Sequence, residues 1–324
     1  MLKLFGLRKW SMRRGKMASL DLTAVQVEIN IDDYLSKERM KEAFSYYLMK
    51  AMNEWNAETH LVVFPEFLGT FLYPGLFSKI DNPKSLLQLL MKYVLRNLSF
   101  KSLNPFKGAF LKHALFVEKL YREAFSELAC QFGTYIVAPS ILLPEITFES
   151  EKGWHIIGHR LYNMSYFFNP SGQLLAKIKK QRLTASETKL IFSEGESEYP
   201  RTITTSFGKA GGLICYDMFF QNIIQTIDAA GANILVVPSC NFALWKSPTR
   251  YFPEKTQEQI WFLHGTIKAS KDRENIRYLV NAMAVGKLGK DTAEGRSSIW
   301  KNGKLLKIAR SWDKSEVINA CVEM

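Results

Sequence analysis

Short apolar runs alternate with amphipathic segments along much of this chain, a pattern that predicts alternating strands and helices. Strands are predicted at 22–29 and 61–64, with a helix between them that ends near Asn56. One face of that helix carries Met40, Phe44, Leu48, Ala51 and Trp55. Two strands joined through a helix need a crossover connection, so the pattern indicates an α/β sheet.

The same pattern continues toward the C-terminus. Further strands are predicted at 135–138, 161–168, 174–178, 203–207, 211–214, 234–237, 278–285, 297–300 and 304–308. Helices are predicted at 117–132, 218–230 and about 254–271. The turn residues Asn169-Pro170-Ser171-Gly172 and Lys301-Asn302-Gly303 predict that the strands on either side of each turn form hairpins.

The alternation of strand and helix patterns is interrupted at residues 71 to about 115, which contain three prolines and a leucine-rich run at 86–96. We interpret the segment as an insertion. Residues 1–16 are basic and precede Met17, which reads like a natural chain start. The predicted organisation is therefore an extension over 1–16, which is a targeting arm or an over-called start, and one folded unit over 17–324.

Composition narrows the class of protein. With 324 residues and 47% hydrophobic content, the chain can bury a large core and is not predicted to be disordered. Four widely spaced cysteines without a CxxC pair favour neither a disulfide framework nor a zinc site, and they fit a reducing, cytoplasmic setting. His155 and His159 flank Gly158 in a poor helix, so no metal site is predicted.

The net charge of +12 resides in two segments. Residues 1–20 hold six basic and no acidic residues, and residues 71–120 hold eight basic and two acidic ones. No nucleic-acid motif accompanies this charge, so nucleic acid is not predicted as a partner. Cations mixed with large apolar residues in 1–16 and 71–115 suggest peripheral contact with an anionic membrane surface. The alternative is an extra helical pair with solvated lysines.

The apolar run 211–214 ends abruptly in Cys215, Tyr216 and Asp217, directly before a predicted helix that Gly231 would terminate. A cysteine at a strand-to-helix turn meets backbone N–H groups and the positive end of a helix dipole, which favour a thiolate. Cys215 is therefore a candidate nucleophile. The alternative is a small buried side chain, which is the commoner role of a single cysteine on an apolar strand.

Two other stretches carry charged candidates. Glu66 follows a predicted strand and Pro65, a place where a carboxylate is unusual for solvation alone, although an N-cap or a surface acid would also explain it. Lys177, Lys179 and Lys180 follow the predicted hairpin turn at 169–172. Three lysines within four residues would ordinarily form a solvated loop.

The ordered set resembles the nitrilase superfamily, the carbon–nitrogen hydrolases. The set consists of a glutamate after a strand and a proline, a lysine after an Asn-Pro-x-Gly hairpin, and a cysteine in Gly-x-Ile-Cys-Tyr-Asp. The resemblance runs from about Leu20 to Ile308, outside the extension and the insertion. It also includes Tyr162-Asn163, the segment 231–235 and Pro238-Ser239.

The resemblance implies that Cys215 is the nucleophile, Glu66 the general base and Lys180 the cation that stabilises the tetrahedral intermediate. Glu187, seven residues after Lys180, matches the family's second glutamate, which orients the substrate and the lysine. These residue types suit the chemistry, since the thiolate attacks a carbonyl, the carboxylate moves the proton and the ammonium offsets the developing negative charge.

Lys180 is preferred over Lys179 because it precedes Leu183 by three residues, as the family's lysine precedes the leucine of Lys-x-His-Leu. The sequence departs from the family pattern at Arg182, where many members have histidine, and at 219–222, where many have Arg-Phe-Pro-Glu. Neither change removes a catalytic group, but both affect the expected substrate class and the packing of the helix after the nucleophile.

The resemblance also implies the fold and the assembly. The expected architecture is a four-layer α-β-β-α sandwich in which two mixed sheets pack face to face between outer helices. Members commonly pair through helices beside the nucleophile, so a homodimer or larger oligomer is expected. Apolar residues proposed for that surface are Phe219, Phe220, Ile223 and Ile227.

The predicted function is hydrolysis of a small-molecule amide or carbamoyl compound, more than of a nitrile, without a cofactor or metal. Two alternatives stay open: an N-acyltransferase that uses the same acyl-enzyme, and a non-catalytic interaction protein that keeps the fold. Residues beside catalytic or strand-end positions are candidates for the pocket lining, and their aromatic character favours an apolar acyl group: Phe67, Tyr216, Asn241 and Phe242.

Overall fold

Alternate residues of strand β2 (Thr59–Val63) enter two different cores in the computed structural model. The structure describes residues 19–78, 83–99, 102–189, 192–196, 201–249 and 252–324. Leu61 and Val63 pack in a core between two sheets, whereas Val62 packs in a core beneath outer helices. A strand that is buried on both faces reads as a continuous apolar run, which explains why the pattern was predictive here.

The first sheet contains seven strands among the described residues. They are β1 (Ser19–Glu28), β2, β3 (Tyr135–Val137), β4 (Ile141–Glu149), β5 (Gly153–Phe168), β6 (Leu174–Lys179) and β14 (Glu316–Glu323). Strands β1, β2 and β3 run parallel to one another, while β5 runs antiparallel to β3, and β14 antiparallel to β1. The sheet is therefore mixed, and the predicted β5–β6 hairpin is confirmed.

The second sheet is also mixed, with parallel pairing of β8, β9 and β10. Its strands are β7 (Thr202–Thr205), β8 (Gly208–Gly212), β9 (Ile234–Cys240), β10 (Tyr278–Leu288), β12 (Ser298–Lys301) and β13 (Lys304–Ile308), with the short β11 (Asp291–Ala293) paired to β10. The two sheets join where Val27 and Glu28 of β1 pair with Ala284 and Val285 of β10.

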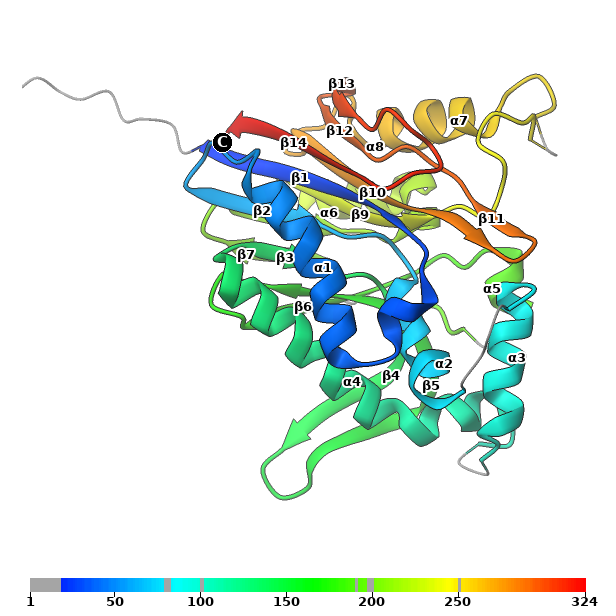
Figure 1. Ribbon diagram of the computed structural model, residues 1–324. Coiled ribbons are helices and arrows are strands. Elements are labelled where there is room, and N and C mark those ends of the chain that lie inside the picture. Colours follow the sequence, from blue (N-terminus) through cyan, green and yellow to red (C-terminus); the bar gives the residue numbers. More distant parts are fainter. Residues whose placement is uncertain (1–18, 79–82, 100–101, 190–191, 197–200, 250–251) are drawn as a thin grey trace, which may run out of the picture.

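Helices cover both outer faces, so the predicted four-layer sandwich is confirmed (Figure 1). The helices are α1 (Lys37–Met52), α2 (Leu72–Phe77), α3 (Leu86–Arg96), α4 (Pro105–Phe132), α5 (Ala185–Lys189), α6 (Gln221–Ala229), α7 (Gln257–Ile260) and α8 (Lys268–Ser270). Helices α1 and α4 lie side by side over the first sheet (Figure 1), where Phe44 and Phe125 pack at 5.1 Å between ring centroids.

Several helix boundaries differ from the prediction. Helix α1 ends at Met52, so Trp55 lies beyond it and stacks on His60. The helix expected over 218–230 is a 3₁₀ turn, Cys215–Phe219, followed by α6. The one expected over 254–271 begins at Gln257 and continues through a π-helical turn, Trp261–Ile267, into α8. Helix α7 begins where the Thr256 side chain caps it and Gln259 completes a capping box, a local signal that apolar periodicity does not register.

Ile223 and Ile227 of α6 are buried inside the subunit, which corrects their proposed place on an exposed pairing surface. Both belong to the core that contains the second sheet, and Phe219 and Phe220 pack against that same core. A short amphipathic helix buries its apolar face against the sheet that it covers, so these residues are not left for a second subunit.

The segment around 71–115 packs as helices against the subunit. Helix α4, expected to begin at 117, begins at Pro105 after the N-cap Asn104 and continues unbroken to Phe132. Most of the apolar side chains considered for membrane contact are buried in the core: Leu90, Tyr93, Val94, Phe110 and Leu111. They are therefore not available to anchor the segment in a bilayer. Residues 1–16 lie outside the described residues.

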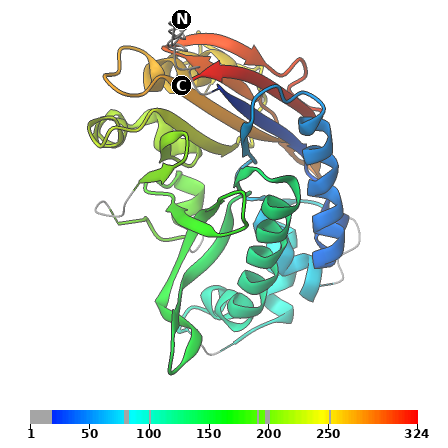
Figure 2. The ribbon, with the colours of Figure 1, turned by 90° about the vertical axis from the view of Figure 1, so that its left-hand side faces the viewer.

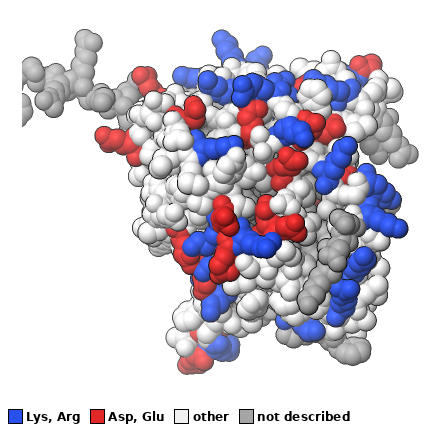
Figure 3. Space-filling view, in the orientation of Figure 1, with Lys and Arg blue, Asp and Glu red and all other residues white. Residues whose placement is uncertain are grey.

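Basic side chains gather along the edge of the molecule where α3 lies, while acidic and basic groups intermix elsewhere on the same face (Figure 3). Helix α3 carries Lys92 and Arg96, and Lys84 precedes it in the chain. The charge of the segment therefore lies at the surface, although most of its apolar residues do not.

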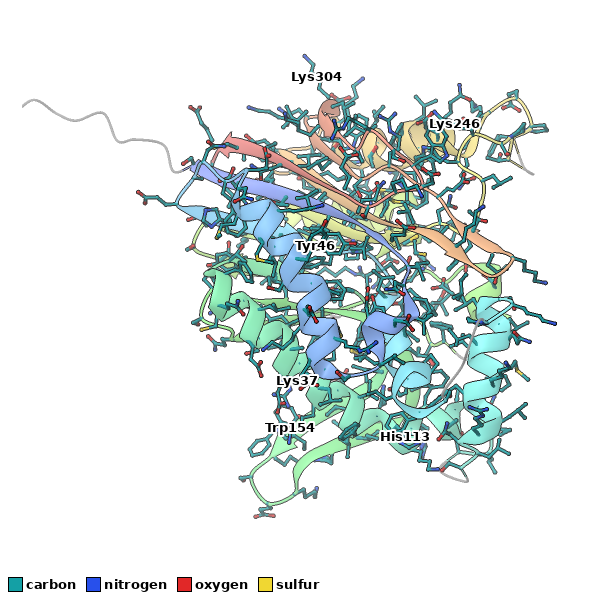
Figure 4. All side chains as sticks on the ribbon, in the orientation of Figure 1. Lys37, Tyr46, His113, Trp154, Lys246 and Lys304 are labelled. Carbon is teal, nitrogen blue, oxygen red and sulfur yellow. The ribbon has the colours of Figure 1, made fainter. Side chains whose placement is uncertain are left out.

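Three strands were not predicted, namely the short β11 and the longer β4 and β14. Strand β4 forms a hairpin with β5 that extends away from the sheets (Figure 2), and Trp154 lies on this projection (Figure 4). Strand β14 pairs with β1 along nearly its full length, from Ser19 opposite Glu323 to Gln26 opposite Glu316. In β14 the buried Ile318, Ala320 and Val322 alternate with more exposed residues, so a local signal for that strand was present, whereas β4 begins with a run of four buried residues and does not alternate there.

Candidate active site

Cys215 lies at the first position of the 3₁₀ turn that follows β8, and its side chain is buried. Its backbone adopts φ 49°, which is in the left-handed region that a non-glycine residue seldom enters. Such strain persists only where the surroundings enforce it, and it often marks functional positions. The Cys215 Sγ points toward the carbonyl of Cys240 at the end of β9, at a distance of 3.6 Å.

Glu66 is held at the end of β2 by neighbours from both sheets. Its backbone N–H donates to the Ser239 carbonyl at 3.3 Å, and its Oε2 accepts from the Cys240 N–H at 3.0 Å. The next residue, Phe67, has φ 73° and donates its N–H to Ser140 Oγ at 2.7 Å. The strand end is therefore bent sharply, and this bend places the carboxylate between the two sheets.

Lys180 follows β6 and bridges the two predicted glutamates. Its Nζ donates to Glu66 Oε1 at 2.7 Å and to Glu187 Oε1 at 2.8 Å. The other oxygen of Glu187 accepts from the backbone N–H and the hydroxyl of Thr184, at 2.8 and 2.9 Å. An ammonium has three N–H donors, so one remains beyond these two ion pairs. The neighbouring Lys179 pairs instead with Glu145 and Glu196, away from Glu66.

Asn163 on β5 links the members of this cluster, a role that the sequence analysis did not assign. Its Nδ2 donates to Glu66 Oε1 at 2.8 Å and lies 3.4 Å from Glu187 Oε1. Its backbone carbonyl accepts from the Lys180 N–H at 2.8 Å. The pair Tyr162-Asn163 was part of the family resemblance, so a signal for this residue was present.

Asp217 joins the cysteine turn to the lysine loop and was also missed. Its buried carboxylate accepts from the backbone N–H groups of Gln181 and Arg182 at 3.0 and 2.7 Å, and it pairs with Arg201 at 3.2 Å. The carboxylate also accepts from the Ile214 N–H at 3.3 Å. One buried aspartate therefore holds the segment after Lys180 against the segment before Cys215.

The pKa of the Cys215 thiol is raised well above its ordinary value of 9.0, first by burial and then by the charge of Glu66, while Lys180 lowers it. Burial and the charge of Glu66 therefore oppose the thiolate that the strand-to-helix turn and Lys180 favour. Burial also raises the pKa of Glu66 above 4.5, although Lys180 lowers it. The thiol donates to the Cys240 carbonyl and Glu66 accepts from the Cys240 N–H, so both groups meet at one residue and a carboxylate lies close to the thiol as an acceptor for its proton.

Cys215, Glu66, Lys180 and Glu187 lie at the floor of a cavity of about 990 Å³. The four predicted pocket residues, Phe67, Tyr216, Asn241 and Phe242, line the same cavity. The amide of Asn241, however, donates to the carbonyls of Ala243 and Glu294, so it shapes a loop rather than presenting a free polar group. Within the described ranges, no three His, Cys, Asp or Glu side chains are grouped as metal ligands would be.

Comparison with known proteins identifies a family and a shared fold. A family model described as carbon-nitrogen hydrolase matches residues 22–324. Omega-amidase NIT2 of Homo sapiens is 30% identical over 145 residues, which cover 42% of this chain and 48% of the relative. Omega-amidase NIT3 of Saccharomyces cerevisiae is 32% identical over 120 residues, 35% and 38% of the two chains. The matched part thus spans about half the length of these relatives, or less.

Solved structures share the fold over nearly the whole chain. The crystal structure of Saccharomyces cerevisiae Nit3, described as a member of branch 10 of the nitrilase superfamily, has a TM-score of 0.63 at 21% identity. The alignment covers 94% of this chain and 90% of that one. An amidase from Nesterenkonia sp. has a TM-score of 0.62 at 17% identity and covers 96% and 92%.

Proposed function

This chain belongs to the carbon–nitrogen hydrolase family, and from that premise we propose that it hydrolyses a linear amide through a thioester on Cys215. The observation that carries the proposal is the buried thiol beside a carboxylate that is itself paired with a lysine. In a mutant of an amidase from Nesterenkonia sp., which shares the fold, acrylamide is joined to the active-site cysteine by Michael addition.

The proposed reaction begins with proton transfer from the Cys215 thiol to Glu66. The sulfur then attacks the amide carbonyl carbon, and a tetrahedral intermediate forms with negative charge on its oxygen. When the C–N bond breaks, Glu66 returns the proton to the leaving nitrogen, so that ammonia or an amine departs and a thioester remains. Water, deprotonated by Glu66, cleaves the thioester to the acid and restores the thiol.

Lys180 is proposed to stabilise the charge on the intermediate. Two of its N–H donors bind Glu66 and Glu187, and the residue lines the cavity beside Cys215. The third donor is therefore the one assigned to the substrate oxygen. Its fixed position means that little reorganisation is needed when charge develops, which is the source of such stabilisation. Glu187 is proposed to hold the lysine in this orientation.

The proposal is tested with Cys215→Ala and with Cys130→Ala as the matched control, because Cys130 is an exposed cysteine on α4. Cys215→Ala should lower kcat/KM for a simple primary amide by about 10³-fold or more, while Cys130→Ala retains wild-type rates. Intact mass spectrometry should detect an acyl adduct on the wild type that is missing from Cys215→Ala. Full activity in Cys215→Ala would refute the scheme.

The two alternatives give different results in the same assay. An N-acyltransferase would divert product from the acid to a new amide when an amine is added, because the amine replaces water at the thioester. A non-catalytic protein would form no acyl adduct, and a thiol reagent would label Cys215 no faster than Cys130.

Assembly and location are also proposals. We propose a homodimer or larger oligomer, which light scattering that showed a strict monomer would contradict. A cytoplasmic location follows from the cysteine usage. Of the described helices, none has the length and apolar character that a bilayer crossing requires. Contact of 1–16 and 71–115 with an anionic membrane rests on charge, and sedimentation with anionic and neutral vesicles tests it.

A further inference from the structure

The cavity above Cys215 is enclosed by two apolar walls. Helix α3 contributes Leu86, Leu87 and Leu90, and the opposite wall includes Phe242 and Phe252 of the loop after β9. Leu87, Phe242 and Phe252 keep 55%, 41% and 46% of their surface exposed. Large apolar side chains left exposed inside a concave site indicate a surface that a ligand covers.

The α3 wall is anchored to the second sheet. The Leu86 N–H donates to the Asp291 carboxylate at 2.8 Å, and the Lys290 N–H donates to the Lys84 carbonyl at 2.9 Å. Gly289 has φ +61°, and a Cβ atom there would lie 2.2 Å from the Lys84 carbonyl carbon. The turn between β10 and β11 therefore fits closely against the start of α3, which keeps the leucines over the cavity.

The opposite wall is anchored in the same way. Trp245 is fully buried, and its backbone N–H donates to Glu294 Oε2 at 2.6 Å, while its indole N–H donates to Glu258 at 3.0 Å. These contacts hold the base of the loop that exposes Phe242 and Phe252. Both walls therefore present apolar side chains from fixed supports, so the surface is prearranged.

Most polar groups in the lining are already engaged by the protein. Thr184 binds Glu187, and Asp291 caps α3. Asn241 accepts from Gln257 at 3.3 Å. Recognition of a polar acyl group needs positioned polar partners in the pocket, whereas a large apolar acyl group needs only the walls.

We infer that the substrate is the amide of a bulky, apolar carboxylic acid, such as a medium-chain alkanoic acid, whose chain lies between α3 and the loop that carries Phe242 and Phe252. The inference rests on the proposed amide hydrolysis and adds the acyl specificity. A cavity of about 990 Å³ is large for an acetamide-sized substrate and suits a ligand of many heavy atoms.

Chain length is the first test. Each methylene group that is fully buried contributes about a fourfold gain in affinity, so four additional methylenes give at most about 250-fold. In the wild-type protein, kcat/KM for octanamide should exceed that for butanamide by about 30-fold or more. Equal values for the two amides, or a larger value for succinamate than for octanamide, would overturn the inference. The second result would point to recognition of a carboxylate by Lys268 or His264, which also line the cavity.

The matched variants are Leu87→Glu and Leu95→Glu. Both leucines are exposed positions on α3, at 55% and 63%, but only Leu87 lines the cavity. Leu87→Glu should lower kcat/KM for octanamide about tenfold or more and leave butanamide within about twofold, since only the longer chain reaches the wall. Leu95→Glu should change neither. Equal effects of the two variants would contradict a role for α3 in binding the acyl chain.

A binding measurement separates failure of the inference from failure of the proposed reaction. Calorimetry with Cys215→Ala should show that octanamide binds at least about tenfold more tightly than butanamide, and that adding Leu87→Glu removes the difference. Tight octanamide binding without turnover by the wild type would support the acyl specificity and refute hydrolysis. Turnover of both amides without a chain-length preference would support hydrolysis and refute the acyl specificity.

Discussion

The floor and the mouth of one cavity are built on opposite principles. At the floor, Glu66, Lys180, Glu187 and Asn163 are linked by hydrogen bonds, and three of them are buried. At the mouth, Leu87 and the phenylalanines of the facing loop are exposed, and their own positions depend on anchors behind them. Charged groups that are shielded from water need ion pairs or hydrogen bonds with one another, because an unpaired buried charge is costly. Apolar groups at the mouth can stay exposed to water at little cost until a ligand covers them.

On this basis the floor is expected to carry out the reaction and the mouth to select the substrate. A change at the floor alters the charge balance of every partner, so its effect on rate should be large for every substrate and should extend to stability. A change at the mouth removes contact area for part of the substrate only. Variants of the floor should therefore affect all substrates, and variants of the mouth only those that reach it.

The largest effect is expected for Lys180→Met. It leaves two carboxylates without their cation, so kcat/KM should fall by about 10³-fold. The free energy of unfolding should fall by about 3–5 kcal/mol, because a buried pair has lost one partner. Lys179→Met is the matched neighbour and should change kcat/KM less than about tenfold, since Lys179 pairs away from Glu66. Steady-state kinetics measures the loss of kcat/KM, and urea unfolding measures the loss of stability. Equal losses of kcat/KM in the two variants would contradict the separate roles of Lys180 and Lys179.

A smaller effect is expected for Asn163→Asp, which replaces the amide donor between two carboxylates with a third acid. We expect kcat to fall about 100-fold with KM nearly unchanged, because the reacting groups are displaced while the mouth is intact. Exposed Asn222→Asp on α6 is the control for the charge change. A variant with raised KM and normal kcat would show that Asn163 acts in binding instead of positioning.

The pH dependence of kcat/KM tests the charge balance at the floor of the cavity. A general base works only when deprotonated, and burial raises the pKa of Glu66 above 4.5, so the acidic limb of kcat/KM should lie above that value. Glu187 also raises this pKa, so Glu187→Gln should move the limb of the residual activity to lower pH. Exposed Glu194→Gln should leave it in place. A limb that moves upward in Glu187→Gln would contradict the coupling.

The smallest effect is expected at the mouth. Phe252→Ser should change the free energy of unfolding by less than about 0.5 kcal/mol, since the ring is exposed at a loop. It should nevertheless raise KM for octanamide severalfold and leave butanamide unaffected. Leu244→Ser, at another exposed position of the same loop, is the control. Strong destabilisation by Phe252→Ser would show that the mouth is part of the core after all.

Local pattern was enough to predict much of this protein. Apolar runs bounded by turn residues located most strands, because a strand buried on both faces must be apolar at every position. The resemblance carried by Glu66, Lys180 and Cys215 predicted residues that the structure brings into one cluster. The choice of Lys180 over Lys179 came from a spacing of three residues to Leu183, and the structure pairs Lys180 with Glu66.

Other features became visible only in the tertiary structure. The contacts of Asn163 and Asp217 join segments that are distant in sequence, and Ile223 faces inward because of the sheet that α6 covers. The direction in which the pKa of Cys215 shifts follows from burial and from neighbouring charges, neither of which a strand-to-helix turn specifies. The order of residues along the chain was sufficient to show which reactive groups are present and which local structure carries most of them. The distances between these groups, their burial and the charges around them depend on how remote segments pack, so their interactions could be read only from the folded chain.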